Sequence, residues 1–255
     1  MTHDATTVLA VRGLVKRYGG LVVTQDVDFE LRQGEVHALV GPNGAGKTTL
    51  LGQLTGDVRS DAGQVFFGER DITRLPVHRR ARLGIGRSFQ ITSVFPDLTV
   101  LENALLAVQA HEGGSFRFWQ RALDDKHAVE RATALLEQVG LDAMAERQAE
   151  QLSHGEHRQL EIALALAGEP KILLLDEPMA GMGLEDSATL TAMLLAMKGT
   201  VAMLLVEHDM NAVFALADRI SVLVYGRCIA TGTPDEIRAD AEVRRAYLGD
   251  DEAAA

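Results

Sequence analysis

Residues 41–48 read Gly41-Pro42-Asn43-Gly44-Ala45-Gly46-Lys47-Thr48 and fit the phosphate-binding loop pattern G-x-x-x-x-G-K-[ST] at every fixed position. The apolar run 36–40 before them predicts a buried strand, and residues 49–54 can continue as a helix. This strand–loop–helix order is the context that the pattern requires, and an ordinary glycine-rich turn explains it less well. Lys47 would bring charge to the outer phosphates, and the Thr48 hydroxyl could ligate Mg²⁺. We therefore expect the chain to bind a nucleoside triphosphate.

Composition narrows the class of protein. The chain has 255 residues, of which 47% are hydrophobic and 24% charged, as in a soluble globular protein with one large domain or a core and a subdomain. A net charge of −11 argues against a nucleic-acid partner and against direct adsorption to an anionic membrane. No apolar run reaches the roughly 18 residues of a membrane span, and the first residues do not form a secretory signal. Any link to a membrane is therefore expected to pass through another protein.

The chain has a single cysteine, Cys228, so an intrachain disulfide cannot form. This fits a reducing compartment. Cys228 lies among small and apolar residues of an expected strand, and we expect it to be a small buried residue of that strand.

The pattern of apolar residues predicts an α/β fold. Alternation at 27–31 and the run 64–67 predict an N-terminal antiparallel β layer. Helices are predicted at 101–108, 126–139, 153–167, 187–197 and 210–217, a loop at 110–118, and strands at 172–175, 201–206 and 220–224. Capping boxes of the S/T-x-x-E type start at Thr99, Ser153 and Thr233. We predict a phosphate-loop ATPase core at 7–90 and 169–249, an inserted helical subdomain at 91–168, and a loose tail at 250–255.

Two acids end the strand predicted at 172–175. At a strand end beside a phosphate loop, Asp176 can hold Mg²⁺ directly or through water. Glu177 can orient and activate an attacking water. A solvated strand end before the turn at Pro178 is the alternative, and the phosphate loop upstream favours the functional interpretation.

The stretch Leu152-Ser153-His154-Gly155-Glu156 precedes a long predicted helix. Ser153 and Glu156 can form a capping box, while Gly155 at the helix start allows an anion to approach the backbone. Both interpretations can hold, because a cap leaves other amides free.

In this order and at these separations, the phosphate loop, Gln90, residues 152–156, Asp176-Glu177 and His208 resemble the ATP-binding subunit of ABC transporters, from Leu9 to about Gly249. The resemblance implies that ATP and Mg²⁺ are bound. It places nucleotide contacts at Tyr18, Gly41, Pro42, Asn43, Gly44, Ala45, Gly46, Lys47, Thr48, Thr49, Ser153, Gly155 and Glu156. It places metal ligands at Thr48, Gln90 and Asp176, and catalytic roles at Glu177, His208, Gln90 and Lys47.

The same resemblance implies more specific roles. Tyr18 would stack on adenine, although it could instead be an aromatic that covers the β layer. Glu177 would be the general base, and His208 would contact the γ-phosphate, although a lone histidine is more often a surface or capping residue. Residues 153–156 would contact the ATP held by a second copy, so that two chains enclose two ATP molecules head to tail.

The sequence departs from the family pattern at two places. His154 and Glu156 stand where the commonest signature has Gly and Gln, and Glu156 brings a negative charge near the partner's phosphates. Gly183 stands where many members have Asp, which leaves the hydrogen bond across the dimer without its usual side chain.

Several stretches resemble the ATPase subunits of branched-chain amino acid importers, with urea importers and lipopolysaccharide exporters as related alternatives. They are 87–90, 98–103, 206–210, 232–237, 245–249 and the insertion between 108 and 128. This implies a peripheral ATPase at the cytoplasmic face of the cell membrane. Its partners would be a second ATP-binding subunit, identical or different, and integral membrane permeases; an extracytoplasmic substrate-binding protein would act indirectly, and no nucleic acid is expected.

Two other classes of function compete. A soluble ATPase switch acting on ribosomes or DNA usually carries two cassettes or a long coiled-coil insertion, and this sequence has neither. A GTPase switch needs an Asn-Lys-x-Asp motif, which the sequence lacks. Within the insertion, Phe116, Phe118 and Trp119 interleave with Arg117 and Arg121. We favour an amphipathic turn packed on its own helix over a docking patch.

Overall fold

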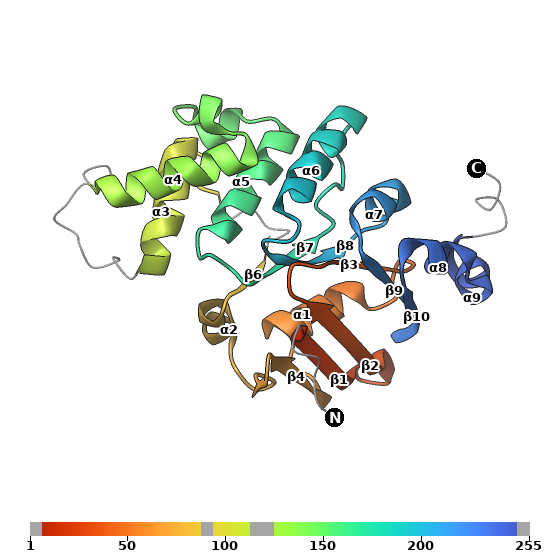
Figure 1. The fold of residues 1–255 in the computed structure, drawn as a ribbon. Coiled ribbons are helices and arrows are strands. Elements are labelled where there is room, and N and C mark those ends of the chain that lie inside the picture. Colours follow the sequence, from red (N-terminus) through yellow and green to blue (C-terminus); the bar gives the residue numbers. More distant parts are fainter. Residues whose placement is uncertain (1–6, 88–93, 113–124, 249–255) are drawn as a thin grey trace.

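A computed structural model of the chain describes residues 7–87, 94–112 and 125–248. It contains two sheets with helices around them (Figure 1). The N-terminal sheet is antiparallel in the order β2-β1-β4-β5, with β1 at Thr7–Tyr18, β2 at Leu21–Arg32, β4 at Ala62–Phe67 and β5 at Arg70–Asp71. These strands form the expected antiparallel β layer.

The second sheet carries the phosphate loop. Its order is β10-β9-β3-β8-β7-β6, and all neighbours are parallel except β10 and β9. The strands are β3 Val36–Val40, β6 Ile85–Arg87, β7 Ile172–Asp176, β8 Ala202–Val206, β9 Arg219–Val224 and β10 Arg227–Gly232. Every residue of β3, β7 and β8 is buried, as expected for parallel strands covered on both faces.

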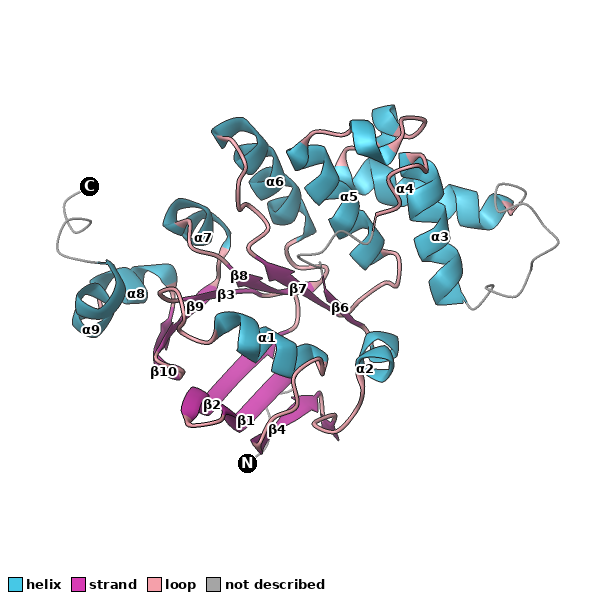
Figure 2. Cartoon of the chain, turned by 180° about the vertical axis from the view of Figure 1, so that it is seen from behind, coloured by secondary structure: helices cyan, strands magenta, loops and turns pink. Residues whose placement is uncertain are grey.

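The helices cover both faces of this sheet. They are α1 Lys47–Thr55, α2 Val77–Leu83, α3 Val100–Glu112, α4 Lys126–Val139, α5 His154–Leu166, α6 Leu184–Met197, α7 Met210–Leu216, α8 Pro234–Ala239 and α9 Ala241–Val243. In both views α1 lies between the two sheets, and α3, α4 and α5 form a group on the other face of the parallel sheet (Figures 1 and 2). Alternate residues of β7 divide between two cores: Ile172 and Leu174 pack toward α1, and Leu173 and Leu175 pack toward the α3–α6 side.

The predicted α/β class is confirmed, and most elements lie where the sequence placed them. The α4 helix has the predicted bounds, and all three capping boxes form. The α3 helix continues to Glu112, into the segment expected to be a loop. A Cβ added to Gly168 would lie 2.5 Å from the His111 ring, so this last turn packs against the backbone after α5.

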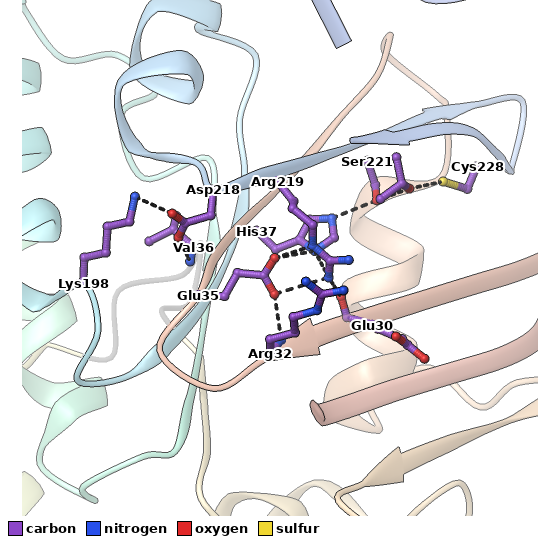
Figure 3. Close-up of polar contacts among 11 residues, drawn as sticks. Glu30, Arg32, Glu35, Val36, His37, Lys198, Asp218, Arg219, Ser221 and Cys228 are labelled. Atoms are coloured by element: carbon purple, nitrogen blue, oxygen red, sulfur yellow. Dashed lines mark hydrogen bonds and ion pairs between the residues drawn. The ribbon is translucent and has the colours of Figure 1, made fainter. Parts of the chain in front are cut away.

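The expectation that Cys228 is buried is wrong. It is half-buried because β10 is the edge strand of the sheet, and its thiol lies 3.3 Å from the Thr231 hydroxyl. This thiol is the outer end of a chain of polar contacts that runs inward to β3 (Figure 3). Ser221 Oγ is 2.7 Å from the Thr231 hydroxyl and 2.8 Å from His37 Nε2.

Candidate functional site

The phosphate loop links the carboxyl end of β3 to α1, and two of its glycines are required by close packing. Gly41 has φ 154°, and a Cβ there would lie 2.0 Å from the carbonyl oxygen of Leu223 in β9. Gly46 has φ 105°, and a Cβ there would lie 2.5 Å from the carbonyl oxygen of Val23 in β2. Only glycine allows the loop to fit between these strands.

Lys47 opens α1 and is folded back onto the loop. Its side chain is buried (6% exposed), and Nζ donates to the carbonyls of Gly41 at 2.6 Å and Pro42 at 3.2 Å. Burial lowers the pKa of Lys47, although the neighbouring carboxylates of Glu177 and Asp176 oppose that shift. Two neutral carbonyls are weak partners for a buried ammonium, so an anionic ligand can compete for it. Asn43, Gly44 and Thr48 are exposed beside it.

Asp176, the predicted metal ligand, ends β7 and is almost fully buried (1% exposed). Arg87 Nη2 donates to its Oδ2 at 3.2 Å, and the same guanidinium donates to Asp57 at 2.9 Å. Oδ1 of Asp176 makes no hydrogen bond within the described parts of the chain. Burial raises the pKa of Asp176, and the Arg87 charge only partly offsets this. A buried carboxylate oxygen without a partner is the position that a cation or an ordered water would satisfy.

Glu177 follows directly and has a left-handed backbone, with φ 46°. Its amide donates to the carbonyl of Val206 at 2.8 Å, which ties it to the end of β8. A non-glycine residue in this conformation costs about 1–3 kcal/mol and is found preferentially at functional positions. The half-buried Glu177 therefore stands in a strained turn that the neighbouring strand holds in place.

Glu207, which was not predicted as a site residue, joins the ends of β7 and β8. Its side chain is fully buried, and its carboxylate accepts from the amides of Met179 at 2.8 Å and His208 at 3.0 Å. His208, by contrast, is 59% exposed at the side chain. The position of Glu207 in the sequence, between a predicted buried strand and the predicted functional His208, could have indicated that it belongs to the site.

The start of α5 lies against the loop that follows β7. Ser153 and Glu156 form the reciprocal cap, at 2.7 Å from the Ser153 amide to Glu156 Oε2 and 3.3 Å from the Glu156 amide to Ser153 Oγ. A Cβ on the buried Gly155 would lie 2.9 Å from the carboxyl carbon of Asp186 in α6. Within the described residues, no hydrogen bond or ion pair joins residues 153–156 to the phosphate loop.

Two side chains connect α5 to that loop. His154 Nε2 lies 3.1 Å from the carbonyl of Ala180. Arg158 donates to the carbonyls of Pro178 at 3.2 Å and Glu177 at 3.3 Å. A shift of α5 would therefore displace the backbone of Glu177. Gly183 follows this loop as the N-cap of α6 and offers no side-chain cap.

Tyr18 stands at the end of β1 with its side chain 52% exposed and the Lys16 ammonium 5.2 Å from the ring centroid. An exposed ring of this kind is free to stack on a flat ligand. Gln90 lies outside the described residues, as do Phe116, Phe118 and Trp119. The structure thus brings together the Lys47 loop, Asp176, Glu177 and His208 at the carboxyl ends of β3, β7 and β8, where parallel α/β sheets bind ligands.

Comparison with protein families gives two matches. The family described as "ABC transporter" matches residues 24–180, and the family described as "Branched-chain amino acid ATP-binding cassette transporter" matches residues 227–253. Within the described residues, none of the helices is long and apolar enough to cross a membrane.

Three curated proteins are similar over nearly the whole chain. The high-affinity branched-chain amino acid transport ATP-binding protein LivG of Salmonella typhimurium is 41% identical over 252 residues, covering 95% of this chain and 98% of that protein. BraF of Pseudomonas aeruginosa, with the same description, is 37% identical over 250 residues, with the same coverage. The lipopolysaccharide export system ATP-binding protein LptB of Escherichia coli K12 is 36% identical over 244 residues, also covering 95% and 98%.

Two solved structures have a fold similar to that of this chain. A nucleotide-free ATP-binding cassette from an ABC transporter superposes with a TM-score of 0.83 at 29% identity, covering 95% of this chain and 99% of that one. The ADP conformation of another such cassette superposes with a TM-score of 0.84 at 28% identity and the same coverage.

Proposed function

The chain belongs to the ABC transporter family of ATP-hydrolysing subunits, and we propose that its ATP hydrolysis drives uptake of branched-chain or other amino acids through separate permease subunits. The observation that carries this is the meeting of the Lys47 loop, Asp176, Glu177 and His208 at one edge of the parallel sheet. The match of residues 227–253 to the branched-chain amino acid group, together with the LivG and BraF relatives, supports the cargo class.

In this proposal the phosphate loop, residues 41–49, holds the phosphates of ATP. The Lys47 ammonium exchanges its two loop carbonyls for phosphate oxygens, which are stronger partners. Tyr18 stacks on the adenine. The ATPase core is formed by residues 7–90 and 169–249, with an inserted helical subdomain at 91–168. The exposed His208 contacts the γ-phosphate, held in place by the bond from its amide to the buried Glu207.

Mg²⁺ would be held by Thr48, Gln90 and Asp176, and the free Oδ1 of Asp176 fits a cation. When bound, the ion would neutralise charge that develops on the phosphates. Burial disfavours the ionised carboxylate of Asp176, and a bound cation would stabilise that ionised form.

Glu177 is the general base of the proposed reaction. Its carboxylate would take the proton of the water that attacks the γ-phosphorus as the bond to the β-phosphate oxygen breaks. The backbone of Glu177 is held in its strained turn by the hydrogen bond that its amide donates to the carbonyl of Val206. Gln90 would orient the same water.

A second ATP-binding subunit, identical or different, completes each site. Residues Ser153, Gly155 and Glu156 are not bonded to the phosphate loop of their own chain, so they are available to ATP held by a partner. ATP would close the dimer, and loss of the γ-phosphate would open it. The bonds from His154 and Arg158 to residues 177–180 would carry this change to Glu177, and permeases bound at the cytoplasmic face of the cell membrane would use it.

Nucleotide binding tests the site directly. Lys47→Ala should abolish binding of ATP, while Lys171→Ala, which removes an exposed lysine just before β7, should bind ATP like the wild type. Full ATPase activity in Lys47→Ala would contradict the assignment.

Dimerisation and co-purification test the transport cycle. Glu177→Gln should bind ATP without hydrolysing it and should sediment as a dimer, whereas a chain that stays monomeric at high protein and Mg-ATP concentrations argues against the closed dimer for the isolated subunit. Permeases that co-purify from a membrane extract would support transport, and ribosomal or DNA-binding partners would contradict it.

A further inference from the structure

Tyr225 occupies an unusual position in the turn between β9 and β10. Val224 pairs with Arg227, so the turn has only two residues, Tyr225 and Gly226, with φ 47° and 78°. A two-residue hairpin with both φ values positive favours Asn, Asp or Gly at its first position. Tyrosine is strained there, and its side chain is 86% exposed, so packing within the described chain does not offset the strain.

The turn lies directly beside the phosphate loop. The amide of Gly226 donates to the carbonyl of Ala45 at 2.9 Å, and the carbonyl of Gly226 accepts from the amide of Gln25 at 2.7 Å. A Cβ on Gly226 would lie 2.4 Å from the carbonyl oxygen of Val23. The turn is therefore clamped between the phosphate loop and β2, the strand that follows Tyr18.

The order of the sheet gives the direction of a bound nucleotide. Asp176, Glu177 and His208 follow β7 and β8, which lie on one side of β3, and β9 lies on the other side. If the γ-phosphate faces the first group and the loop after β3 holds the phosphate chain, the ribose and base extend toward the β9 side. The turn with Tyr225 borders that side, and the β2 strand to which it is clamped leads back to Tyr18.

We propose that Tyr225 binds the base–ribose end of the nucleotide, as a second aromatic side chain beside Tyr18. This rests on the proposed ATP site, and it explains why the turn carries an exposed, strained tyrosine in place of asparagine. The ring would stack on the purine or cover the ribose, and such contacts do not involve the phosphates.

The test measures binding of ADP and of inorganic tripolyphosphate, which has no base, by isothermal titration calorimetry. Tyr225→Asn introduces the residue that the turn prefers, so its melting temperature should not fall. Its affinity for ADP should fall about 10-fold, the size of a lost base–aromatic contact, while its affinity for tripolyphosphate should stay unchanged. Tyr225→Phe should bind ADP within about twofold of wild type, because the ring remains.

Two further variants complete the set. Tyr18→Ala is the reference for loss of a base contact, and Leu195→Ala, at an exposed apolar residue of α6, is the control that should bind both ligands normally. Unchanged ADP binding by Tyr225→Asn would overturn the inference and leave the proposed function intact. Equal loss of both ligands would also overturn it, since the turn would then only support the loop. Failure of the wild type to bind ADP would instead overturn the proposed function itself.

Discussion

The buried polar groups at the two ends of the parallel sheet differ in how fully they are hydrogen-bonded. At the amino ends of β3 and β9, Arg219 bonds to Glu35 and to His37 Nδ1 at 3.3 Å, and His37 Nε2 bonds to Ser221 (Figure 3). All buried polar atoms of Glu35, His37 and Ser221 have partners there. At the carboxyl ends, within the described residues, Asp176 keeps an unpaired oxygen and Lys47 donates only to two carbonyls.

The charges at the two ends differ in the same sense. Burial, together with the Arg219 charge, lowers the pKa of His37 to about 3, so the imidazole is neutral. Because Arg219 donates to Nδ1, Nε2 carries the proton and donates to Ser221. Burial raises the pKa of Asp176, and the Arg87 charge offsets this shift only in part. Within the described residues, the buried polar groups named at the amino end pair with one another, whereas Asp176 at the carboxyl end keeps an oxygen that the proposed ligand could pair.

Glu177→Asn should have the largest effect on activity. Loss of the proposed general base should slow ATP hydrolysis by about 10²–10⁴-fold. Asparagine tolerates the left-handed backbone better than glutamate, so the free energy of unfolding should stay the same or rise. Steady-state ATPase assays and urea unfolding measure the two quantities.

The matched control for this prediction is Glu177→Gln, which removes the carboxylate but keeps the shape of glutamate. It should lose the same activity without the gain in stability. If Glu177→Asn were much less stable than the wild type, the Glu177 side chain would stabilise the fold, and the idea that its strained backbone is kept for function would be wrong.

Arg219→Met should do the opposite. It leaves the buried Glu35 carboxylate without its cation, which should lower the free energy of unfolding by about 3 kcal/mol. Nucleotide affinity, measured under conditions where the variant is folded, should be unchanged. The double variant Glu35→Leu/Arg219→Met removes both charges and should be more stable than Arg219→Met alone. A loss of ATP binding equal to that of Lys47→Ala would show that the two ends are not independent.

The neutral His37 also predicts a pH dependence of stability. Its pKa is about 3 in the folded chain and about 6.5 when unfolded, so below pH 6.5 the unfolded chain takes up a proton that the folded chain does not. The free energy of unfolding should therefore fall by up to about 1.4 kcal/mol per pH unit as the pH decreases from about 6.5 to 3. Urea unfolding of wild type and His37→Gln at pH 5 and 7 measures this, and an equal pH slope in both would contradict it.

The sequence predicted best where a local pattern carries the information. The phosphate loop, the exact bounds of α4 and the three capping boxes depend on neighbouring residues, and they were predictable for that reason. The half-buried state of Cys228 depends on β10 being an edge strand, which is a property of the whole sheet.

Within the site, the motif residues were predictable but their connections were not. Glu207 and Arg158 act through contacts with the backbone of residues 177–179, across 19 to 28 positions of sequence. The strain at Glu177 and Tyr225 is a backbone property that residue type alone predicts poorly. Such features follow from packing of distant segments.

Glu156→Gln should have the smallest effect on the fold, because Glu156 lies at the exposed start of α5, where the ATP of a partner would bind. Glutamine keeps the oxygen that accepts from the Ser153 amide, so the cap survives and the free energy of unfolding should change by less than about 0.5 kcal/mol.

The charge matters only when a partner's ATP approaches. Removing the negative charge of Glu156 should strengthen ATP-driven dimerisation several-fold in a Glu177→Gln background, because like charges near the phosphates no longer repel. Sedimentation at low and high salt measures this, and the gain should shrink as salt screens the exposed carboxylate. Glu137→Gln, at an exposed acid of α4, is the control and should not change dimerisation. An equal gain in both variants would mean that net charge, and not contact with the partner's phosphates, limits closure of the dimer.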